Sequence, residues 1–300
     1  MSAQGSALAR ETATVRQWRR GFWGMASKFW RDQPLGVIGA ALVLLMVMVA
    51  AFAEVIAPYS PLETHRGVSF AAPSLRFWLG ADELGRDVLS RVLYGTRLSL
   101  YVGLVSVLLG TTIGAGVGVI SGYMGKKVDI LLQRIIDTVM AFPTLILALA
   151  IVAVLGPSLN NVVIAVSVVL IPRGARVLRS AALSVKENPY IEAARAIGCS
   201  NTRVLLRHVL PQCMAPYIIV ATAAIGWAIT VEATLNFLGV GAPPPTPSWG
   251  AMLSGAGRQH LETSPWIAIS PGVALSLTVF GFSLLGDALR DVLDPRLRRA

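Results

Sequence analysis

Long uncharged stretches alternate with short polar ones along this chain. Five uncharged runs are close to or longer than the roughly 20 residues that a helix needs to cross the hydrocarbon core of a bilayer. They are Leu35 to Ala53, Leu98 to Gly125, Thr138 to Pro172, Met214 to Val231 and Thr263 to Gly286. The third run is too long for one helix, and Gly156-Pro157-Ser158 breaks it near its middle. The pattern therefore predicts an all-α integral membrane protein with six transmembrane helices.

The composition agrees with this class. Hydrophobic residues make up 54% of the chain and charged residues 14%, and the mean hydropathy is +0.64. Most of the Lys and Arg residues fall in the first 34 residues, after the second run, between the fourth and fifth spans, and at the C-terminus. The positive-inside rule then places both termini and these loops in the cytoplasm. Cytoplasmic loops that face anionic lipid account for the net charge of +10, so no nucleic-acid partner is predicted.

These spans divide the chain into five parts. We expect a basic cytoplasmic tail at 1–34, a first transmembrane helix at 35–57, a periplasmic segment at 58–96, a transmembrane domain of five helices at 97–290 with a cytoplasmic loop at 173–213, and a cytoplasmic tail at 291–300. Ala51-Phe52-Ala53 has the small residues of a signal-peptide cleavage site. The long charged leader and long apolar run favour an uncleaved helix instead.

One cytoplasmic segment, which we call the polar island (residues 186–211), has the signals of two short helices. Asn188 is a suitable N-cap with Pro189 at the first helical position, and Gly198 is a stop. Ser200 or Asn201 can cap a second helix, which we expect to end at Pro211. Helices this short are marginal alone, so we expect them to dock on a partner.

The first of these helices has an apolar face suited to such a partner. Ile191, Ala194 and Ile197 recur at spacings of three residues, while Glu192 and Arg195 share another face. A groove in another protein is the expected place for the apolar face.

The second span contains glycines at four-residue spacing. They are Gly110, Gly114, Gly118 and Gly122. This ladder leaves one helix face nearly flat, and flat faces let helices approach closely in lipid. It predicts a helix-packing seam, either static or in a bundle that shifts.

Few charges lie in or beside the spans. Glu54 and Asp287 lie near the predicted interfaces, and Asp137 is one turn from Arg134 and can pair with it. Glu232, near the outer end of the fifth span, is the one that we single out, together with Asn236. Two roles remain open for it: lining a pathway, or capping an outer vestibule.

The residue types that commonly take part in catalysis do not form a recognisable catalytic centre in this sequence. The three histidines are scattered, and Cys199 and Cys213 have only His208 between them, which is no metal-ligand pattern. No nucleophile-elbow, zinc-protease or phosphate-loop motif is present. We therefore expect a chain that is not an enzyme and has no metal or cofactor of its own, with any ATP chemistry in another polypeptide.

The polar island closely resembles the EAA loop of bacterial ABC-transporter permeases. The matching residues are Glu192, Ala193, Ala194, Gly198, Leu210 and Pro211. In that family the loop forms coupling helices that seat in a groove of a cytoplasmic ATPase. The resemblance implies the fold of a type I ABC importer transmembrane domain. It assigns ATPase coupling to Ile191, Glu192, Ala193, Ala194, Arg195, Ile197, Gly198 and Pro211.

Three further stretches narrow the resemblance to C-type subunits of the dipeptide, oligopeptide and nickel permease group. They are Leu79 to Arg91, Pro243 to Gly250 and Leu285 to Pro295. We expect the charges of the first stretch to lie on a capped, solvated helix, and the proline-rich second stretch to shape an outer mouth for a binding protein.

The resemblance also implies a function and partners. It implies half of a translocation pathway for short peptides in the bacterial inner membrane. The implied partners are a homologous B-type permease, two ABC ATPases that bind ATP and magnesium, and an extracytoplasmic substrate-binding protein. Import of nickel or metal chelates or of glutathione-like solutes is the alternative within the family, and an ion-gradient-driven secondary carrier is a remote alternative outside it.

Overall fold

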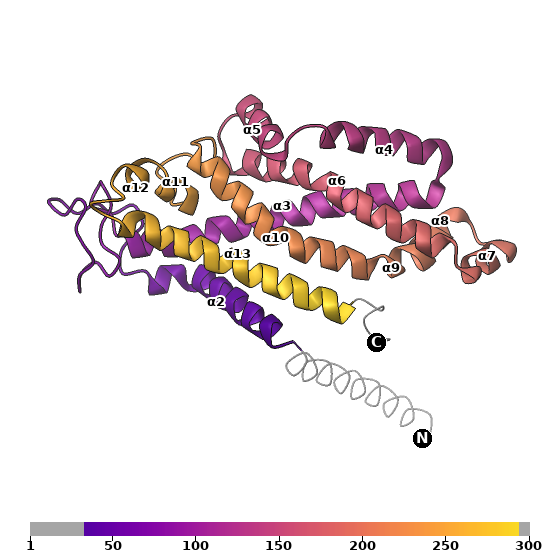
Figure 1. The fold of residues 1–300 in the computed structure, drawn as a ribbon, viewed down its shortest axis with the longest axis horizontal. Helices are drawn as coiled ribbons and strands as arrows, with labels where there is room; N and C mark the ends of the chain where they lie inside the picture. The colour runs from indigo at the N-terminus through magenta and orange to yellow at the C-terminus, as the bar shows by residue number, and fades with distance from the viewer. Residues whose placement is uncertain (1–32, 294–300) are drawn as a thin grey trace, which may run out of the picture.

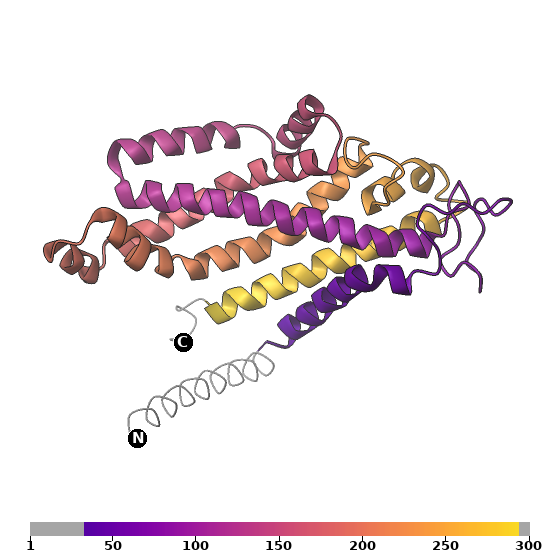
Figure 2. The same ribbon diagram turned by 180° about the vertical axis from the view of Figure 1, so that it is seen from behind.

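The protein is a bundle of helices that lie roughly along one axis, in a computed structural model that describes residues 33–293 (Figures 1 and 2). The long helices are α2 (Pro34–Ile56), α3 (Val88–Met124), α4 (Lys126–Met140), α5 (Thr144–Leu155), α6 (Leu159–Lys186), α10 (Met214–Phe237) and α13 (Trp266–Leu293). The short ones are α7 (Pro189–Ala196), α8 (Asn201–Val204), the π-helix η1 (Leu205–Val209), α9 (Leu210–Gln212), α11 (Trp249–Leu253) and α12 (Gly255–Gln259). Within the described residues, β-structure is limited to one bridge between Ala81 and Asp87.

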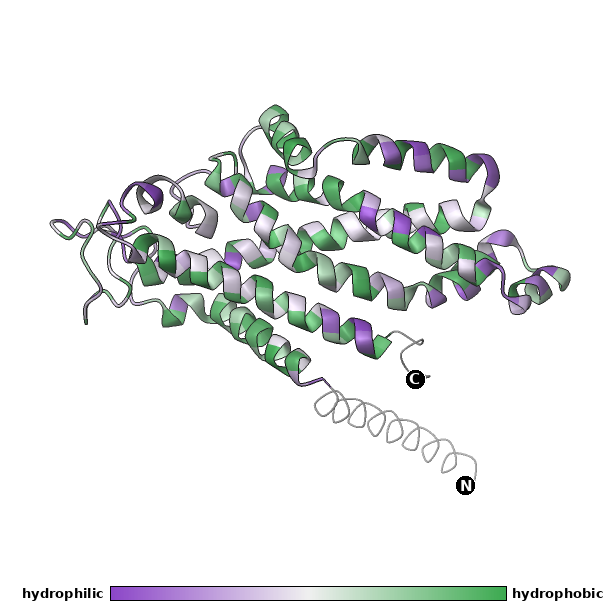
Figure 3. Ribbon diagram, in the orientation of Figure 1, coloured by the Kyte–Doolittle hydropathy of each residue, from purple (hydrophilic) through white to green (hydrophobic). Residues whose placement is uncertain are grey.

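The two ends of the bundle differ in what they carry. At one end, which we call the α7 end, lie α7, α8 and the last residues of α3, α6 and α13 (Figure 1). At the other, the α11 end, lie α11, α12 and the irregular segment 57–87 between α2 and α3 (Figure 1). Figure 3 shows mainly apolar residues along α2 and α13, and polar residues at α7, α8, the α11 end, along α4 and within α6.

The predicted fold class is confirmed, with one change to the third span. Five described helices, α2, α3, α6, α10 and α13, are long and apolar enough to cross a membrane. The remaining crossing consists of α4 and α5, which are bent by 88° at the break after Met140. The expected break at Gly156 to Ser158 separates α5 from α6, where the Ser158 hydroxyl accepts a hydrogen bond from Asn161 N at 3.2 Å.

Several helices extend beyond their predicted bounds. The helix expected to start near Leu98 begins at Val88, because the Asp87 carboxylate accepts a hydrogen bond from Ser90 N at 2.8 Å and caps it. Residues 88–96 of the expected periplasmic segment are therefore helical. Similarly, α6 continues through Pro172 to Lys186, so the first part of the expected loop 173–213 is helical too. The last span runs to Leu293 instead of Gly286.

The glycine ladder of α3 lies against α6. A Cβ at Gly110 or Gly114 would collide with the backbone carbonyl of Ser167 or Ile171, and one at Gly118 or Gly122 with that of Ala175 or Arg179. Both series rise in steps of four, so α3 and α6 run in the same direction. The chain must cross back between them, and α4 with α5 provides that return.

Three clusters of buried side chains hold the described residues together, the smallest of them formed by Val88, Val92, Met252 and Ile267 at the α11 end. The largest lies between α3, α5, α6 and α10, and it includes Trp249 of α11. The second lies at the α7 end, where Ile191, Val204 and Val209 of the polar island pack on Ala115, Val119 and Tyr123 of α3. The second cluster explains why the short helices of the island are formed within a single chain.

The first span is attached mainly through glycine contacts with the last. A Cβ at Gly39 of α2 would lie 2.6 Å from Leu285 N of α13, and one at Gly281 would lie 2.9 Å from Leu42 Cβ. Most other side chains of α2 face outward. The expected cytoplasmic tails, 1–34 and 291–300, fall almost entirely outside the described residues.

Candidate functional site

The polar island is built by the local signals that the sequence contains. Pro189 occupies the first position of α7, and Gly198 ends it with φ +85°, a conformation that a Cβ disfavours. Cys199 N then donates to Ala194 O at 3.0 Å, which satisfies a carbonyl of the last turn. The expected Asn188 cap differs: its side-chain amide donates back to Ser184 O and Val185 O at the end of α6.

The second half of the island departs from the predicted single helix. Ser200 caps it, since its hydroxyl accepts a hydrogen bond from Arg203 N at 3.4 Å. The chain then passes through α8, η1 and α9 and reaches α10 after Cys213. Pro211 does not end this helical stretch, because it lies in the first turn of α9, where its missing N–H matters least.

The predicted apolar face of α7 is divided between two environments. Ile191 is 0% exposed and Ala194 is buried, so both pack in the chain's own core. Ile197 is 82% exposed. The expectation that Ile191 contacts a partner is therefore corrected: its side chain already has a place within this chain. The exposed surface of α7 and its C-terminal turn contains Glu192, Ala193, Arg195, Ile197 and Gly198.

Tyr123, at the end of α3, holds the island to the bundle. Its ring lies 5.3 Å from the Arg195 guanidinium carbon, and its hydroxyl donates to Asn201 Oδ1 at 3.0 Å. No local sequence pattern indicates this role of Tyr123, because its polar contacts come from residues far along the chain. A displacement of α7 or α8 would therefore act directly on α3.

Two ion pairs join α4 to α6. Asp129 accepts hydrogen bonds of 2.6 Å from both Nε and Nη2 of Arg179, and Asp137 lies 2.9 Å from Nη2 of Arg176. The expected pairing of Asp137 with Arg134 is not the one formed, because α4 folds back against α6 and brings Arg176 within reach. A bidentate pair such as Asp129 with Arg179 fixes orientation as well as distance.

Glu232, at the α11 end of α10, is buried with 0% exposure. Ser99 Oγ of α3 donates to its Oε2 at 2.8 Å, and Asn236 Nδ2 donates to its Oε1. Asn236 Oδ1 in turn accepts from Ala242 N at 2.8 Å, which ties the network to the loop after α10. In this conformation Glu232 braces three segments and does not line an open pathway. Ser99 is a partner that sequence spacing alone does not reveal.

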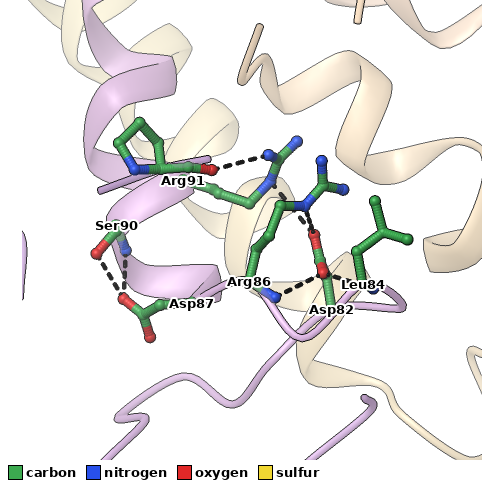
Figure 4. Close-up of polar contacts among 7 residues, drawn as sticks. Asp82, Leu84, Arg86, Asp87, Ser90 and Arg91 are labelled. Atoms are coloured by element: carbon green, nitrogen blue, oxygen red, sulfur yellow. Dashed lines mark hydrogen bonds and ion pairs between the residues drawn. The ribbon is translucent and has the colours of Figure 1, made fainter. Parts of the chain in front are cut away.

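A second polar cluster lies at the start of α3 (Figure 4). Asp82 Oδ1 accepts hydrogen bonds of 2.9 Å from Leu84 N and Arg86 N, and its Oδ2 accepts one of 2.6 Å from Arg86 Nε. Arg91 Nε lies 3.5 Å from the same oxygen, and Arg91 Nη1 donates to Pro61 O at 3.1 Å. We call Asp82, Arg86 and Arg91 the Asp82 cluster.

The Asp82 cluster corrects the expectation of a solvated helix. Asp82 and Arg91 are buried, and Asp82 and Arg86 lie in a turn before α3. Gly85 completes this turn with φ +73° and approaches the His65 backbone so closely that a Cβ would collide with the His65 carbonyl oxygen. The charges therefore hold the segment 57–87 against α3.

Arg97 ties α3 to the end of α2. Its Nε donates to Ala50 O at 2.5 Å, its Nη2 to Ala51 O at 3.1 Å, and its Nη1 to Glu54 Oε1 at 2.7 Å. An arginine at the edge of an apolar stretch is a sequence signal for such a partner, although it does not say which residues form it.

The side chains that could hold a metal ion are scattered over the described residues. Residues 33–293 contain no group of three or more His, Cys, Asp or Glu side chains placed to hold a metal ion. The two cysteines are free; His208 lies in the polar island, whereas His65 and His260 both lie at the α11 end, where each packs on a phenylalanine of segment 57–87.

Comparisons with known proteins give consistent results. The family described as "Binding-protein-dependent transport system inner membrane component" matches residues 114–299, and "N-terminal TM domain of oligopeptide transport permease C" matches residues 21–73. The dipeptide transport system permease protein DppC of Alkalihalophilus pseudofirmus is 41% identical over 92% of this chain and 90% of its own length. The di/tripeptide permease DppC of Pseudomonas aeruginosa is 42% identical over 91% and 93%.

A third relative and a solved structure extend the comparison. The glutathione transport system permease protein GsiD of Escherichia coli O6:K15:H31 is 44% identical over 90% of both chains. A chain of the MetNI methionine ABC transporter in an inward-facing conformation superposes with a TM-score of 0.56 at 21% identity, over 69% of this chain and 97% of that one. At that identity the superposition concerns the fold alone.

Proposed function

Because this chain belongs to the family of binding-protein-dependent transport system inner membrane components, we propose that it is a permease subunit of an ABC importer for short peptides. The observation that carries the proposal is its 41% identity, over 92% of its length, to a dipeptide permease. An alignment over nearly the whole length supports a shared function as well as a shared fold. The chain itself is a conduit and leaves ATP hydrolysis to separate subunits that bind ATP and magnesium.

The proposed setting is the bacterial inner membrane, with the α7 end in the cytoplasm. At that end lie Lys126, Lys127, Arg176, Arg179, Lys186, Arg195, Arg203 and Arg207. The positive-inside rule supports this orientation. The segment 57–87 and the helices α11 and α12 are then periplasmic, and both termini are cytoplasmic.

The proposed partners follow from this orientation. A homologous B-type permease completes the pathway, two ABC ATPases dock at the α7 end, and an extracytoplasmic binding protein delivers solute at the α11 end. We propose that the exposed residues of the polar island contact the ATPases. Ile197 supplies the apolar contact and Glu192 the polar one, while Arg195 contributes from its position over the Tyr123 ring.

Transmission of the ATPase movement needs a stiff connection, and the fold contains one. The island is continuous with α6 on one side and α10 on the other. Its buried side chains share a cluster with α3, and Tyr123 adds a hydrogen bond. A pull on α7 therefore reaches three membrane helices at once. The seam between α3 and α6 makes those two helices move as one body.

One alternative substrate class, glutathione-like solutes, has an observation in its favour. The glutathione permease relative is as similar to this chain as the peptide permeases are. Glutathione-like solutes and nickel or metal chelates remain the alternatives within the family. Dipeptides, tripeptides and glutathione share free carboxylate and ammonium groups, so the pathway chemistry that they require is similar.

Purification with its partners tests the proposal directly. The chain is isolated in mild detergent from its native membranes, and co-purifying proteins are identified by mass spectrometry. We expect a second permease and one or two proteins with phosphate-binding loops. The complex is then placed in proteoliposomes with its binding protein, and uptake of labelled dialanine, glutathione and nickel is measured with and without ATP.

The two classes of transporter predict opposite results in that assay. An ABC importer takes up solute only with ATP and the binding protein, and an ion gradient alone does nothing. Uptake by the isolated chain on a proton or sodium gradient without ATP would overturn the proposal in favour of a secondary carrier.

A further inference from the structure

A hollow of about 370 Å³ lies at the α11 end of the bundle. Its walls come from the turn before α3, the end of α10, the loop after α10, the short helices α11 and α12, and the start of α13. Exposed residues such as Glu83 and Thr246 lie on its rim, so it is open to solvent. Its volume is at the lower end of the range of small-molecule sites.

The hollow contains positive groups with free hydrogen-bond donors. Arg86 and Arg91 both line it, and Figure 4 shows their guanidinium groups side by side over the Asp82 carboxylate. The only side-chain hydrogen bond of Arg86 within the described residues is from Nε to Asp82, which leaves its two terminal amino groups available. Arg91 Nε is buried and has no hydrogen-bond partner there. Paired guanidinium groups are suited to binding a carboxylate bidentately.

The same hollow also contains a free negative group. Glu83 lines it and is exposed, and it makes no hydrogen bond or ion pair within 4 Å in the described part of the chain. Asp82, by contrast, already accepts hydrogen bonds from Leu84 N, Arg86 N and Arg86 Nε. Both signs of charge are thus presented in one space, and Met252 of α11 and Ile267 of α13 contribute apolar parts of its lining.

We propose that this hollow is a binding site for a zwitterionic short peptide, with Arg86 and Arg91 receiving its carboxylate and Glu83 receiving its ammonium group. The inference rests on the proposed function and names where the substrate first meets this chain. A solute with both charges free satisfies donors and acceptor together, whereas a solute with one end blocked leaves a charged group of the hollow without a partner. The site therefore selects for free termini.

Glu83 is the residue that tests the site cleanly. Substitution of Arg86 would break the Asp82 cluster and disturb the segment 57–87, so loss of binding would have two explanations. Glu83→Gln removes only a side-chain charge that has no structural contact. Glu262→Gln is the matched control, because Glu262 is exposed at the same end and does not line the hollow.

Occupancy of the hollow is measured by how strongly a bound solute protects an introduced thiol from labelling. Thr246→Cys places a reporter on the rim, and Ser254→Cys places a second on another wall. Membranes come from cells that contain the whole transporter but lack its binding protein. The rate of labelling by a membrane-impermeant maleimide is measured in the presence of dialanine, N-acetyl-dialanine or dialanine amide. We expect dialanine to slow labelling of both reporters and the two blocked forms to have little effect.

The variants then assign the contact. Because Glu83 is exposed, the loss of its ion pair with the ammonium group should raise the half-protecting concentration of dialanine roughly two- to fivefold in Glu83→Gln. Glu262→Gln should leave it unchanged. Absence of protection by dialanine, equal protection by the blocked forms, or equal behaviour of the two variants would overturn the site.

Two further measurements separate this inference from its rivals. If peptide-free binding protein protects the reporters and dialanine does not, the hollow is a docking surface for that protein, and the peptide site is refuted. ATP-driven uptake of dialanine by the unmodified transporter is measured in parallel. Uptake without protection refutes only the hollow, whereas absence of ATP-driven uptake refutes the proposed function.

Discussion

Gly118 of α3 lies directly against the backbone of Ala175 in α6. A Cβ at position 118 would collide with the Ala175 carbonyl oxygen, and it would lie 2.9 Å from Arg179 N. Gly116, two residues away, has nothing within 4 Å of the place where its Cβ would be. One helix thus contains a glycine that the packing requires and another that it does not.

Substitution by alanine should therefore have opposite effects at these two positions. Gly118→Ala forces the helices apart and should destabilise the protein by about 1–3 kcal/mol, as overpacking does. Gly116→Ala meets no contact and should be neutral or stabilising by up to about 1 kcal/mol, because alanine is the better helix former. Thermal unfolding of both variants in the same detergent measures the difference. Equal unfolding temperatures would contradict the seam.

Arg97 should stabilise the end of α2. Phe52 departs from helical geometry with φ −101° and ψ 15°, and Arg97 donates to the carbonyls of Ala50 and Ala51 beside it. Arg97→Ala leaves these groups without their donor, so hydrogen exchange in the last turns of α2 should become faster. Hydrogen-exchange mass spectrometry of the purified chain measures this rate for the peptide that covers the end of α2.

Glu54→Ala is the control for Arg97. It removes only the ion pair with Arg97, in which the Glu54 side chain is 69% exposed, and exposed pairs contribute little. Its exchange rates should match those of the unmodified protein. If Glu54→Ala accelerated exchange as much as Arg97→Ala, the carbonyl contacts would not be the source of the stability.

What the sequence predicts well here is what depends on local spacing. The glycines of α3 recur every four residues, so their shared face follows from helix geometry alone. Pro189 and Gly198 mark the bounds of α7 because the backbone preferences of proline and glycine are also local. Six apolar stretches and the residues that carry the resemblance led to the fold class and the family.

What the sequence does not predict depends on which distant residues meet. Asp137 is one turn from Arg134, yet it pairs with Arg176, because α4 folds back on α6. Ile191 and Ile197 have the spacing of one face, but α7 lies so that the first is buried and the second exposed. The hollow at the α11 end contains residues from five elements, and no local pattern indicates such a space.

The two cysteines should react at different rates with maleimides. Cys213 is 1% exposed, and burial raises the pKa of its thiol, so less of it is thiolate at neutral pH. Cys199 is half-buried, at the turn after α7. We expect Cys199 to label first in inside-out vesicles without ATPases. Mass spectrometry of the labelled peptides identifies the site.

The variant Cys199→Ser gives the check on this assignment. It should remove the fast phase of labelling and leave the slow one, whose rate should increase as the pH is raised because the Cys213 thiol then ionises. Loss of the slow phase in Cys199→Ser would mean that Cys213 is not the slow site. Protection of Cys199 by added ATPase subunits would place the partner over this turn.

The two isoleucines of the polar island should separate stability from coupling. Ile191→Ala removes a fully buried side chain and should cost roughly 2–5 kcal/mol of folding stability. Ile197→Asp changes a side chain that is 82% exposed and should leave thermal unfolding unchanged, while it places a charge at the proposed ATPase contact. Gly198→Asp should disturb the same contact by another route, because the space around it is empty but its φ of +85° is strained for a residue with a Cβ, so the turn after α7 must shift. Both of these variants should insert normally and lose ATPase co-purification and ATP-driven uptake, and Glu187→Gln on the same loop should lose neither.

Normal uptake by Ile197→Asp and Gly198→Asp at normal membrane levels would refute the coupling role of the island. A large drop in unfolding temperature for Ile197→Asp would instead show that its side chain serves the fold.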